Sequence, residues 1–296
     1  MDNRLLGKQA SQSIRADIKR NVDFIVQSGL RPPHLAAILV GNDGASATYV
    51  AAKEKACEEV GFNSTIINLS EVTTQEELLG RIEAINNNED IDGLIVQLPL
   101  PAHIDENIIT EAISPNKDVD GFHDFNMGRL AKGKAIINPA TPFGILLLLQ
   151  HYNISLDGKH VVIIGRSNIV GRPLSILLSS NNEFGNATVT LCHSHSKNLK
   201  DLCLQADVLV AAIGKPYYVT ADMVKKGAVV IDVGTTRIDA DNERGWKLAG
   251  DVDYKAVKEK ASYITPVPGG VGPMTITGLL SNTLLVRKLR LNQNIA

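Results

Sequence analysis

The stretch KHVVIIGRSNIVGRPLSILL, residues 159–178, indicates how the second half of the chain folds. An apolar run ends at Gly165, a polar turn follows, and Gly171 precedes apolar residues with helical spacing. This order predicts a strand, a turn and a helix that bind a phosphate, because glycine lets the backbone approach an anion and a helix N-terminus presents free N–H groups. The usual Gly-x-Gly-x-x-Gly fingerprint would need glycine at Ser167, so a βα turn built only for packing remains an alternative.

The segments after this stretch repeat the same rhythm. Apolar runs occupy residues 187–192, 207–214 and 228–234, and Gly214 and Gly234 stand at the ends of the last two. Short apolar runs separated by helical patterns predict a parallel sheet. Glycines at several strand ends favour a nucleotide cofactor over a purely structural turn.

The end of the run 187–192 indicates which dinucleotide binds. NAD sites commonly place an acidic residue there, whereas the 2′-phosphate of NADP needs positive charge. This run ends in Cys192, His193, Ser194 and His195 without an acid, and Arg166 in the first turn supplies a guanidinium. We therefore predict NADP. The two histidines could also be read as metal ligands, but no third ligand stands near them in the sequence, so we predict no metal site.

The first half of the chain alternates in the same way. Expected strands are 35–40, 65–69 and 93–98, and expected helices are 8–28 and 46–60. A third helix is expected from a capping box of Thr73 and Glu76 to about Asn87. Residues 99–142 lack a sustained period and are predicted to be rich in loops. Further helices are expected at about 142–152 and 275–289.

Length and composition bound the class of protein. The chain has 296 residues, 44% of them hydrophobic, and a net charge of −2. About two globular domains fit this length, and the charge balance argues against nucleic acid as a partner. Three cysteines without a Cys-x-x-Cys pair favour a reducing compartment. We expect no membrane span and no signal peptide, and hence a cytoplasmic protein.

Polar residues in the first half are candidates for catalysis. Tyr49 and Lys53 are four residues apart and share a helix face, where a desolvated lysine can do acid–base work. A surface pair would have the same spacing. Gln97 interrupts the buried run LIVQLPLP, so its amide must find hydrogen bonds, and it could orient a lysine.

Two loops carry weaker signals. KDVDGFHDF holds Asp118, Asp120 and Asp124, which fit an Asx turn, a cation site or an acceptor for amino groups of a ligand. PVPGGVGPMT, residues 266–275, is dense in proline and glycine, which indicates backbone close to a ligand or a plain loop before a helix.

Together these motifs resemble the bifunctional methylenetetrahydrofolate dehydrogenase/methenyltetrahydrofolate cyclohydrolase family, over essentially the whole chain. The resemblance rests on several ordered segments: SATYVAAKEKACEEVGF (46–62), DGLIVQLPLP (92–101), KDVDGFH (117–123), NPATPFG (138–144), GRSNIVGRP (165–173), AAIGKP (211–216), IDVGTTR (231–237) and TPVPGGVGPMT (265–275).

The resemblance implies an α/β fold of two domains with the active site in the cleft between them. Residues 1–140 plus 276–296 would form the folate-binding catalytic domain, and residues 141–275 a Rossmann-like NADP-binding domain with a parallel sheet. It also implies a homodimer that takes a reduced folate as its small-molecule substrate.

The resemblance also implies roles for single residues. Catalytic residues would be Lys53, Gln97 and Asp120. Substrate-binding residues would be Tyr49, Lys53, Gln97, Asp120, Pro268 and Gly269. Cofactor-binding residues would be Gly165, Arg166, Ser167, Gly171, Ser194, Gly214, Thr235 and Thr275.

The implied reaction has two steps. NADP oxidises 5,10-methylenetetrahydrofolate to the methenyl form, and hydrolysis then gives 10-formyltetrahydrofolate, with Lys53 managing the protons of the second step. Two alternatives remain: a monofunctional NAD(P)-dependent dehydrogenase, and a non-catalytic folate- or nucleotide-binding protein on the same scaffold.

Overall fold

The computed structural model describes residues 2–41, 44–242 and 244–293, with only the backbone for residues 45–47 and 293. Contacts divide the chain into two compact units. One comprises Ser13–Ala140 and the segment from Ile276 onward, and the other comprises Thr141–Thr275 and the segment up to Gln12. The chain passes between units within three helices: α1 (Gly7–Gln27), α6 (Ala140–His151) and α10 (Val271–Gln293).

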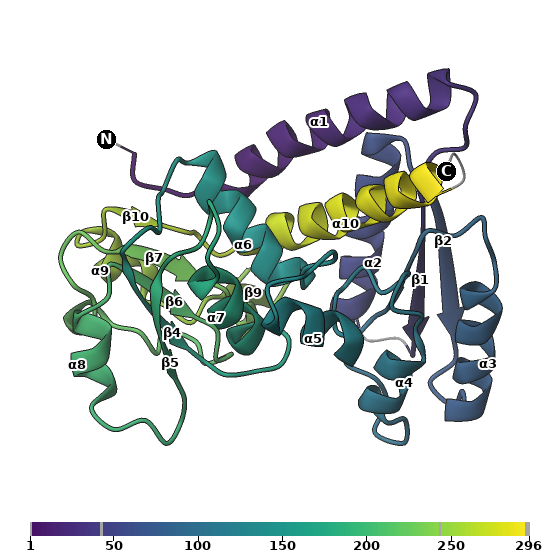
Figure 1. Ribbon diagram of the computed structural model, residues 1–296. Coiled ribbons are helices and arrows are strands. Elements are labelled where there is room, and N and C mark those ends of the chain that lie inside the picture. The colour runs from purple at the N-terminus through teal and green to yellow at the C-terminus, as the bar shows by residue number, and fades with distance from the viewer. Residues whose placement is uncertain (1, 42–43, 243, 294–296) are drawn as a thin grey trace. The chain divides into compact units, whose positions relative to one another are not determined.

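The unit containing residues 13–140 is built on a parallel sheet of order β2-β1-β3 (Figure 1). Its strands are β1 (His34–Val40), β2 (Asn63–Leu69) and β3 (Gly93–Val96), where the sequence predicts them. The central strand β1 is buried on both faces, because Leu35 and Ala37 enter one apolar core while Ala36 and Ile38 enter another. Such a strand reads as a continuous apolar run.

Helices cover both faces of this sheet. The helices α1, α2 (Gly44–Val60) and α10 fill one core, and α3 (Gln75–Asn86) and α4 (Glu106–Ala112) fill the other. The helix α5 (Asp124–Ala131) follows the acidic loop. The α10 helix joins the first core through Leu279, Leu280 and Leu284, so the end of the chain completes a unit that begins near its start.

The unit containing residues 141–275 has a five-stranded parallel sheet of order β10-β7-β6-β4-β5. Its strands are β4 (His160–Ile164), β5 (Thr188–Cys192), β6 (Val208–Ala211), β7 (Val229–Asp232) and β10 (Tyr263–Ile264). The helices are α7 (Gly171–Ser179), α8 (Leu199–Leu204), α9 (Tyr254–Lys258) and the 3-10 turn η1 (Ala221–Met223). A hairpin of β8 (Thr236–Asp239) and β9 (Trp246–Ala249) follows β7.

The strand order of this sheet determines where a ligand binds. Chain order reverses between β4 and β6, and open α/β sheets bind ligands beyond the carboxyl ends of the strands at such a reversal. The predicted α/β class, with a Rossmann-like second domain, is confirmed.

Three expectations need correction. Residues up to Gln12 join the unit of 141–275, because Leu5 donates its N–H to Ile264 (2.8 Å) and Ile264 donates to Asn3 (2.9 Å). The capping box is Thr74 with Glu77, one residue later than expected, and the helix begins at Gln75. Residues 99–142 hold the helices α4 and α5, and α10 begins at Val271, four residues before the expected start.

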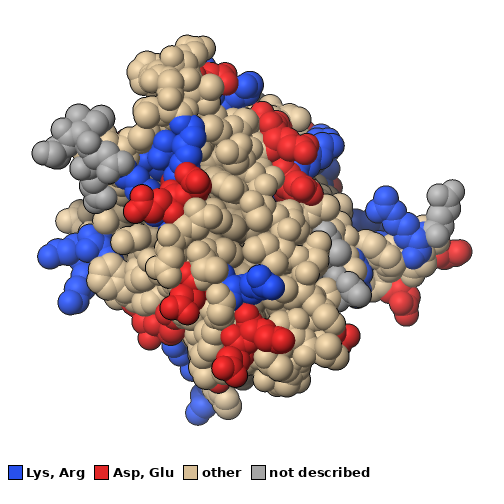
Figure 2. All heavy atoms as spheres, turned by 90° about the vertical axis from the view of Figure 1, so that its right-hand side faces the viewer, with Lys and Arg blue, Asp and Glu red and all other residues tan. Residues whose placement is uncertain are grey.

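The described helices include none that is long and apolar enough to cross a membrane. Figure 2 shows Lys and Arg side chains mixed with Asp and Glu side chains across one face of the molecule, with uncharged areas between them.

Candidate active site

A buried lysine and a glutamine form the centre of the first unit's site. Lys53 lies on α2, is 6% exposed, and donates from Nζ to Oε1 of Gln97 at 3.0 Å. Gln97 follows β3, and its own Nε2 donates to the carbonyl of Leu98 at 2.7 Å, so the amide orientation is fixed with its oxygen toward the lysine. The sequence predicted this pairing, and the structure brings the two side chains together.

Asp120 acts electrostatically on this lysine. Burial lowers the pKa of Lys53, and the negative charge of Asp120 opposes that lowering. Burial raises the pKa of Asp120, the charge of Lys53 opposes the rise, and Asp118 adds to it. A lysine whose pKa is lowered can serve in general acid–base catalysis.

Asp118 builds the loop that carries Asp120. Its carboxylate accepts the N–H groups of Gly121 (3.0 Å), Phe122 (3.2 Å) and His123 (2.9 Å). The carbonyl of Asp120 accepts the N–H of Ala140 at 3.0 Å. Of the alternatives for the acidic loop, Asp118 therefore forms the Asx-type turn.

Tyr49 lies one helical turn before Lys53 on α2. It is partly buried, and burial raises the pKa of its phenol. The phenol ring is therefore neutral at physiological pH and offers a flat apolar face near the lysine.

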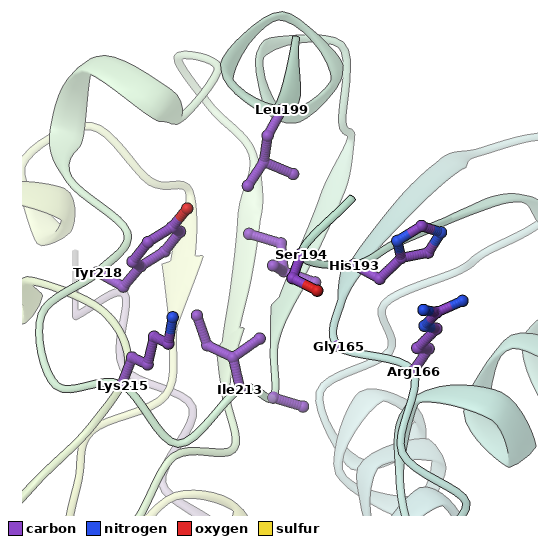
Figure 3. A pocket seen from close by; sticks show the side chains of 10 residues that line it. Gly165, Arg166, His193, Ser194, Leu199, Ile213, Lys215 and Tyr218 are labelled. Atoms are coloured by element: carbon purple, nitrogen blue, oxygen red, sulfur yellow. The ribbon is translucent and has the colours of Figure 1, made fainter. Parts of the chain in front are cut away.

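A cavity of about 310 Å³ lies at the sheet reversal of the second unit. Figure 3 shows Arg166 and His193 on one side of it and Lys215 and Tyr218 on the other. The lining residues are Ile164, Gly165, Arg166, His193, Ser194, Leu199, Ala212, Ile213, Lys215 and Tyr218. Among these described residues there is no carboxylate, and two, Arg166 and Lys215, are basic.

The electrostatics of this cavity favour an anion. Desolvation, the Arg166 guanidinium and the neighbouring His195 imidazole lower the pKa of His193. Lys215 extends over the ring of Tyr218, with Nζ 5.8 Å from the ring centroid. A phosphorylated ligand would supply the negative charge that balances these basic side chains.

Two glycines allow the turn that borders the cavity. Gly165 has φ of 116°, and a Cβ there would overlap the carbonyl oxygen of Ala212. A Cβ on Gly171 would overlap the carbonyl oxygen of Gly165. The start of α7 therefore packs directly on the end of β4, which explains why both residues are glycine.

The other predicted residues lie outside the cavity lining. Ser167 accepts the N–H of Val170 at 3.1 Å and so shapes the turn, and Gly214 stands between the lining residues Ile213 and Lys215. Thr235 is exposed after β7. Thr275 shares a hydrogen bond with Thr141 at 3.1 Å. Pro268 and Gly269 lie in the turn before α10, in the unit of 141–275, where the Gly269 carbonyl accepts the N–H of Lys8.

Sequence reasoning missed Lys215 and Tyr218 as lining residues. Both follow Gly214 in the segment after β6, and the strand order, which the sequence does not give, shows that this segment borders the sheet reversal. His193, one of the two histidines for which the sequence predicts no metal, also lines the cavity.

The class of protein is therefore a two-unit α/β protein with a buried lysine bonded to a glutamine in one unit and a cavity at the sheet reversal in the other. Residues 5–120 match the tetrahydrofolate dehydrogenase/cyclohydrolase catalytic domain, and residues 139–291 match the NAD(P)-binding domain of the same family. The chain belongs to the tetrahydrofolate dehydrogenase/cyclohydrolase family, as the resemblance predicted.

Relatives match over nearly their full length. "Bifunctional protein FolD" of Cytophaga hutchinsonii is 56% identical over 285 residues, which cover 96% of this chain and 98% of that protein. The protein of the same name from Flavobacterium johnsoniae is 54% identical over 289 residues, covering 97% and 98%.

Solved structures show the same fold. The bifunctional FolD methylenetetrahydrofolate dehydrogenase/cyclohydrolase of Campylobacter jejuni has a TM-score of 0.90 and 47% identity, and the match covers 97% of this chain and 99% of that one. The Trypanosoma brucei enzyme, complexed with NADP cofactor and inhibitor, has a TM-score of 0.91 and 36% identity, with 97% of each chain covered.

Proposed function

We propose that the protein oxidises 5,10-methylenetetrahydrofolate to 5,10-methenyltetrahydrofolate with NADP and then hydrolyses the product to 10-formyltetrahydrofolate. The observation that carries this proposal is the buried pair of Lys53 and Gln97 beside Asp120. A dehydrogenase that only transfers hydride has no need of a buried amine for proton transfer. Family membership supplies the folate, which the geometry alone does not identify.

The hydrolytic step needs proton transfer. Water adds to the cationic methenyl carbon and loses a proton, and ring opening requires a proton on the departing nitrogen. The Lys53 amine, with its lowered pKa, takes the first proton and returns it to the nitrogen. Gln97 holds the amine without adding charge, which keeps that pKa low.

For further residues we propose the roles that the family resemblance implies. The Asp120 carboxylate accepts hydrogen bonds from the amino groups of the pterin. The Tyr49 ring stacks on the folate. Pro268 and Gly269 present main-chain atoms to the substrate.

The cavity in the second unit fits NADP. When bound, this cofactor accepts the hydride from the methylene carbon of the folate. Gly165 and Gly171 allow its phosphates close to the backbone. The family resemblance implies further contacts to the cofactor from Ser167, Gly214, Thr235 and Thr275. Arg166 and Ser194 bind the 2′-phosphate, which accounts for a lining with cations and no carboxylate among the described residues. The protein's part in hydride transfer is orientation.

We further propose a cytoplasmic homodimer that acts in one-carbon metabolism and supplies formyl groups for purine biosynthesis. The three cysteines are buried and unpaired, which suits a reducing compartment. The strand β2 pairs with β1 on one side only among the described strands, and such an edge is suited to a second copy of the chain. The net charge of −2 and the mixed charges of Figure 2 support a small substrate over nucleic acid.

The test mixes purified protein with 5,10-methylenetetrahydrofolate and either NADP or NAD, and follows reduced nicotinamide and the methenyl chromophore together. We expect reduction with NADP and no build-up of methenyl product. Build-up would identify a monofunctional dehydrogenase. Absence of reduction with both cofactors would refute the proposed dehydrogenase.

A further inference from the structure

Two fully enclosed carboxylates lie beside the cavity, and no step of the proposed reaction uses them. Asp232 ends β7 and is 2% exposed, and Asp251 follows β9 and is 0% exposed. Carboxylates this deeply buried are kept in a structure only when hydrogen bonds compensate for the loss of water.

The Asp251 carboxylate binds three consecutive main-chain N–H groups. Oδ2 accepts from Ile213 (2.7 Å) and Gly214 (3.1 Å), and Oδ1 accepts from Lys215 (2.8 Å). These three residues form the turn after β6, and Ile213 and Lys215 line the cavity. The Asp251 side chain therefore fixes the path that the backbone takes after β6, where it forms one wall of the cavity.

The chain next to Asp251 extends the same support. The Gly250 carbonyl accepts the N–H of Tyr217 at 3.0 Å, and the Asp251 carbonyl accepts that of Val219 at 2.9 Å. Tyr218, between them, is the ring over which Lys215 extends. The segment around Asp251 thus holds the backbone of the lining residues Ile213 and Lys215, and the backbone on both sides of Tyr218.

Asp232 in turn holds Asp251. Its Oδ1 accepts the N–H of Asp251 at 2.8 Å and of Gly234 at 3.0 Å, and its Oδ2 accepts that of Val252 at 3.0 Å. Packing is tight, since a Cβ on Gly234 would overlap the Asp251 carboxylate. Asp251 therefore has little freedom to move away from the turn.

We propose that Asp251 is a positioning residue for NADP. Its carboxylate fixes the turn of Ile213, Gly214 and Lys215 before the cofactor binds, and Asp232 holds Asp251 in place. This inference rests on the proposed function for the identity of the cofactor. It assigns Asp251 no contact with the reacting atoms.

The test is Asp251→Asn in the full-length protein. An amide has one acceptor oxygen, and its NH₂ group would face a main-chain donor, so at least one charge-assisted hydrogen bond is lost. We expect the KM for NADP to rise about tenfold or more, which corresponds to the loss of one such bond. The kcat at saturating NADP and the hydrolysis of added 5,10-methenyltetrahydrofolate, assayed without NADP, stay at the wild-type rates.

Asp253→Asn is the matched control. Asp253 lies two residues further on and caps α9 by accepting the N–H of Ala256, a role that asparagine also performs. It should leave the KM for NADP unchanged. Gly214→Ala is a second probe, because Gly214 has φ of 66° and a side chain strains the same turn while the carboxylates stay intact. We expect it to raise the KM for NADP as Asp251→Asn does.

An unchanged KM for NADP in folded Asp251→Asn would overturn the proposal. So would a parallel loss of dehydrogenase and hydrolytic activity in both Asp251→Asn and Gly214→Ala, which would mean a general structural role. Calorimetric titration with NADP provides an independent readout. If the wild-type protein binds NADP but has no folate activity, the proposed function fails, while the titration still tests Asp251.

Discussion

Burial, a hydrogen bond and a nearby carboxylate act together on the amine of Lys53. The side chain is nearly inaccessible, its Nζ donates to a neutral amide, and a carboxylate acts on it from the acidic loop. Burial favours the neutral amine and Asp120 favours the ammonium, so the balance between them sets the pH at which the group exchanges protons.

Replacing Lys53 by methionine keeps the apolar stem and removes the amine. We expect hydrolysis of 5,10-methenyltetrahydrofolate to fall by about 100-fold or more, the scale of general acid–base catalysis. The methenyl absorbance measures this directly, and circular dichroism checks the fold. Hydrolysis near the wild-type rate would remove Lys53 from the mechanism.

Gln97→Glu tests the balance of charge at the same site. A carboxylate in place of the amide favours the ammonium form of Lys53 and raises its pKa. The rising limb of the pH–rate profile for hydrolysis should therefore move by about one unit to higher pH. Gln97→Asn adds no charge and serves as control. A profile that stays in place in Gln97→Glu would show that Lys53 is not the titrating group.

At the scale of elements, the packing of α7 on the end of β4 determines the cofactor turn. Gly171→Ala places a methyl group against the Gly165 carbonyl and forces the helix start away from the turn. Overpacking of this kind costs about 1–3 kcal/mol, so we expect NADP affinity to fall about tenfold with hydrolysis retained. Gly80→Ala in α3, where a Cβ meets no atom within 4 Å, is the control. Equal NADP affinity in the two variants would contradict this account.

Elements differ in how far sequence predicts them. The apolar runs at 35–40 and 160–165 predict strands, because strands buried on both faces leave a continuous apolar signal. The start of α3 was placed one residue early because TTQEE fits a capping box in two registers. The helices α4 and α5, with 7 and 8 residues, are too short for a helical period to show.

The residues of the candidate sites also differ in how far the sequence predicts them. Lys53 and Gln97 were predictable together, because a buried amine and a buried amide each need a polar partner. Lys215 and Tyr218 were not predicted, since only the strand order shows that the chain after β6 borders the cavity. Residues up to Gln12 were assigned to the wrong unit because their contacts with β10 span the whole chain in sequence.

At the scale of the whole molecule, the Asp232 carboxyl links stability to pH. Burial and the neighbouring Asp251 charge raise the pKa of Asp232 from 3.8 to about 7, against its hydrogen bonds. The folded state therefore binds this proton more tightly than the unfolded state, and the stabilisation is lost as pH rises from about 4 to 7.

Asp232→Asn removes this titration. Between about pH 4 and 7, the free energy of unfolding of the wild type should fall by up to about 4 kcal/mol relative to that of the variant. Urea unfolding, followed by the fluorescence of the single tryptophan, Trp246, reports on the unit concerned. Parallel pH dependence in the two proteins would contradict the raised pKa.

The chain passes between its two units inside α1, α6 and α10 and not in loops. A chimera that exchanged the nucleotide-binding unit between relatives would have to join the two sequences inside three helices, each in the correct helical register. Joints in loops would tolerate small errors in length, but joints in helices do not. Recombination is therefore a poor route to a new cofactor preference in this architecture. Point substitutions around the cavity are the accessible route.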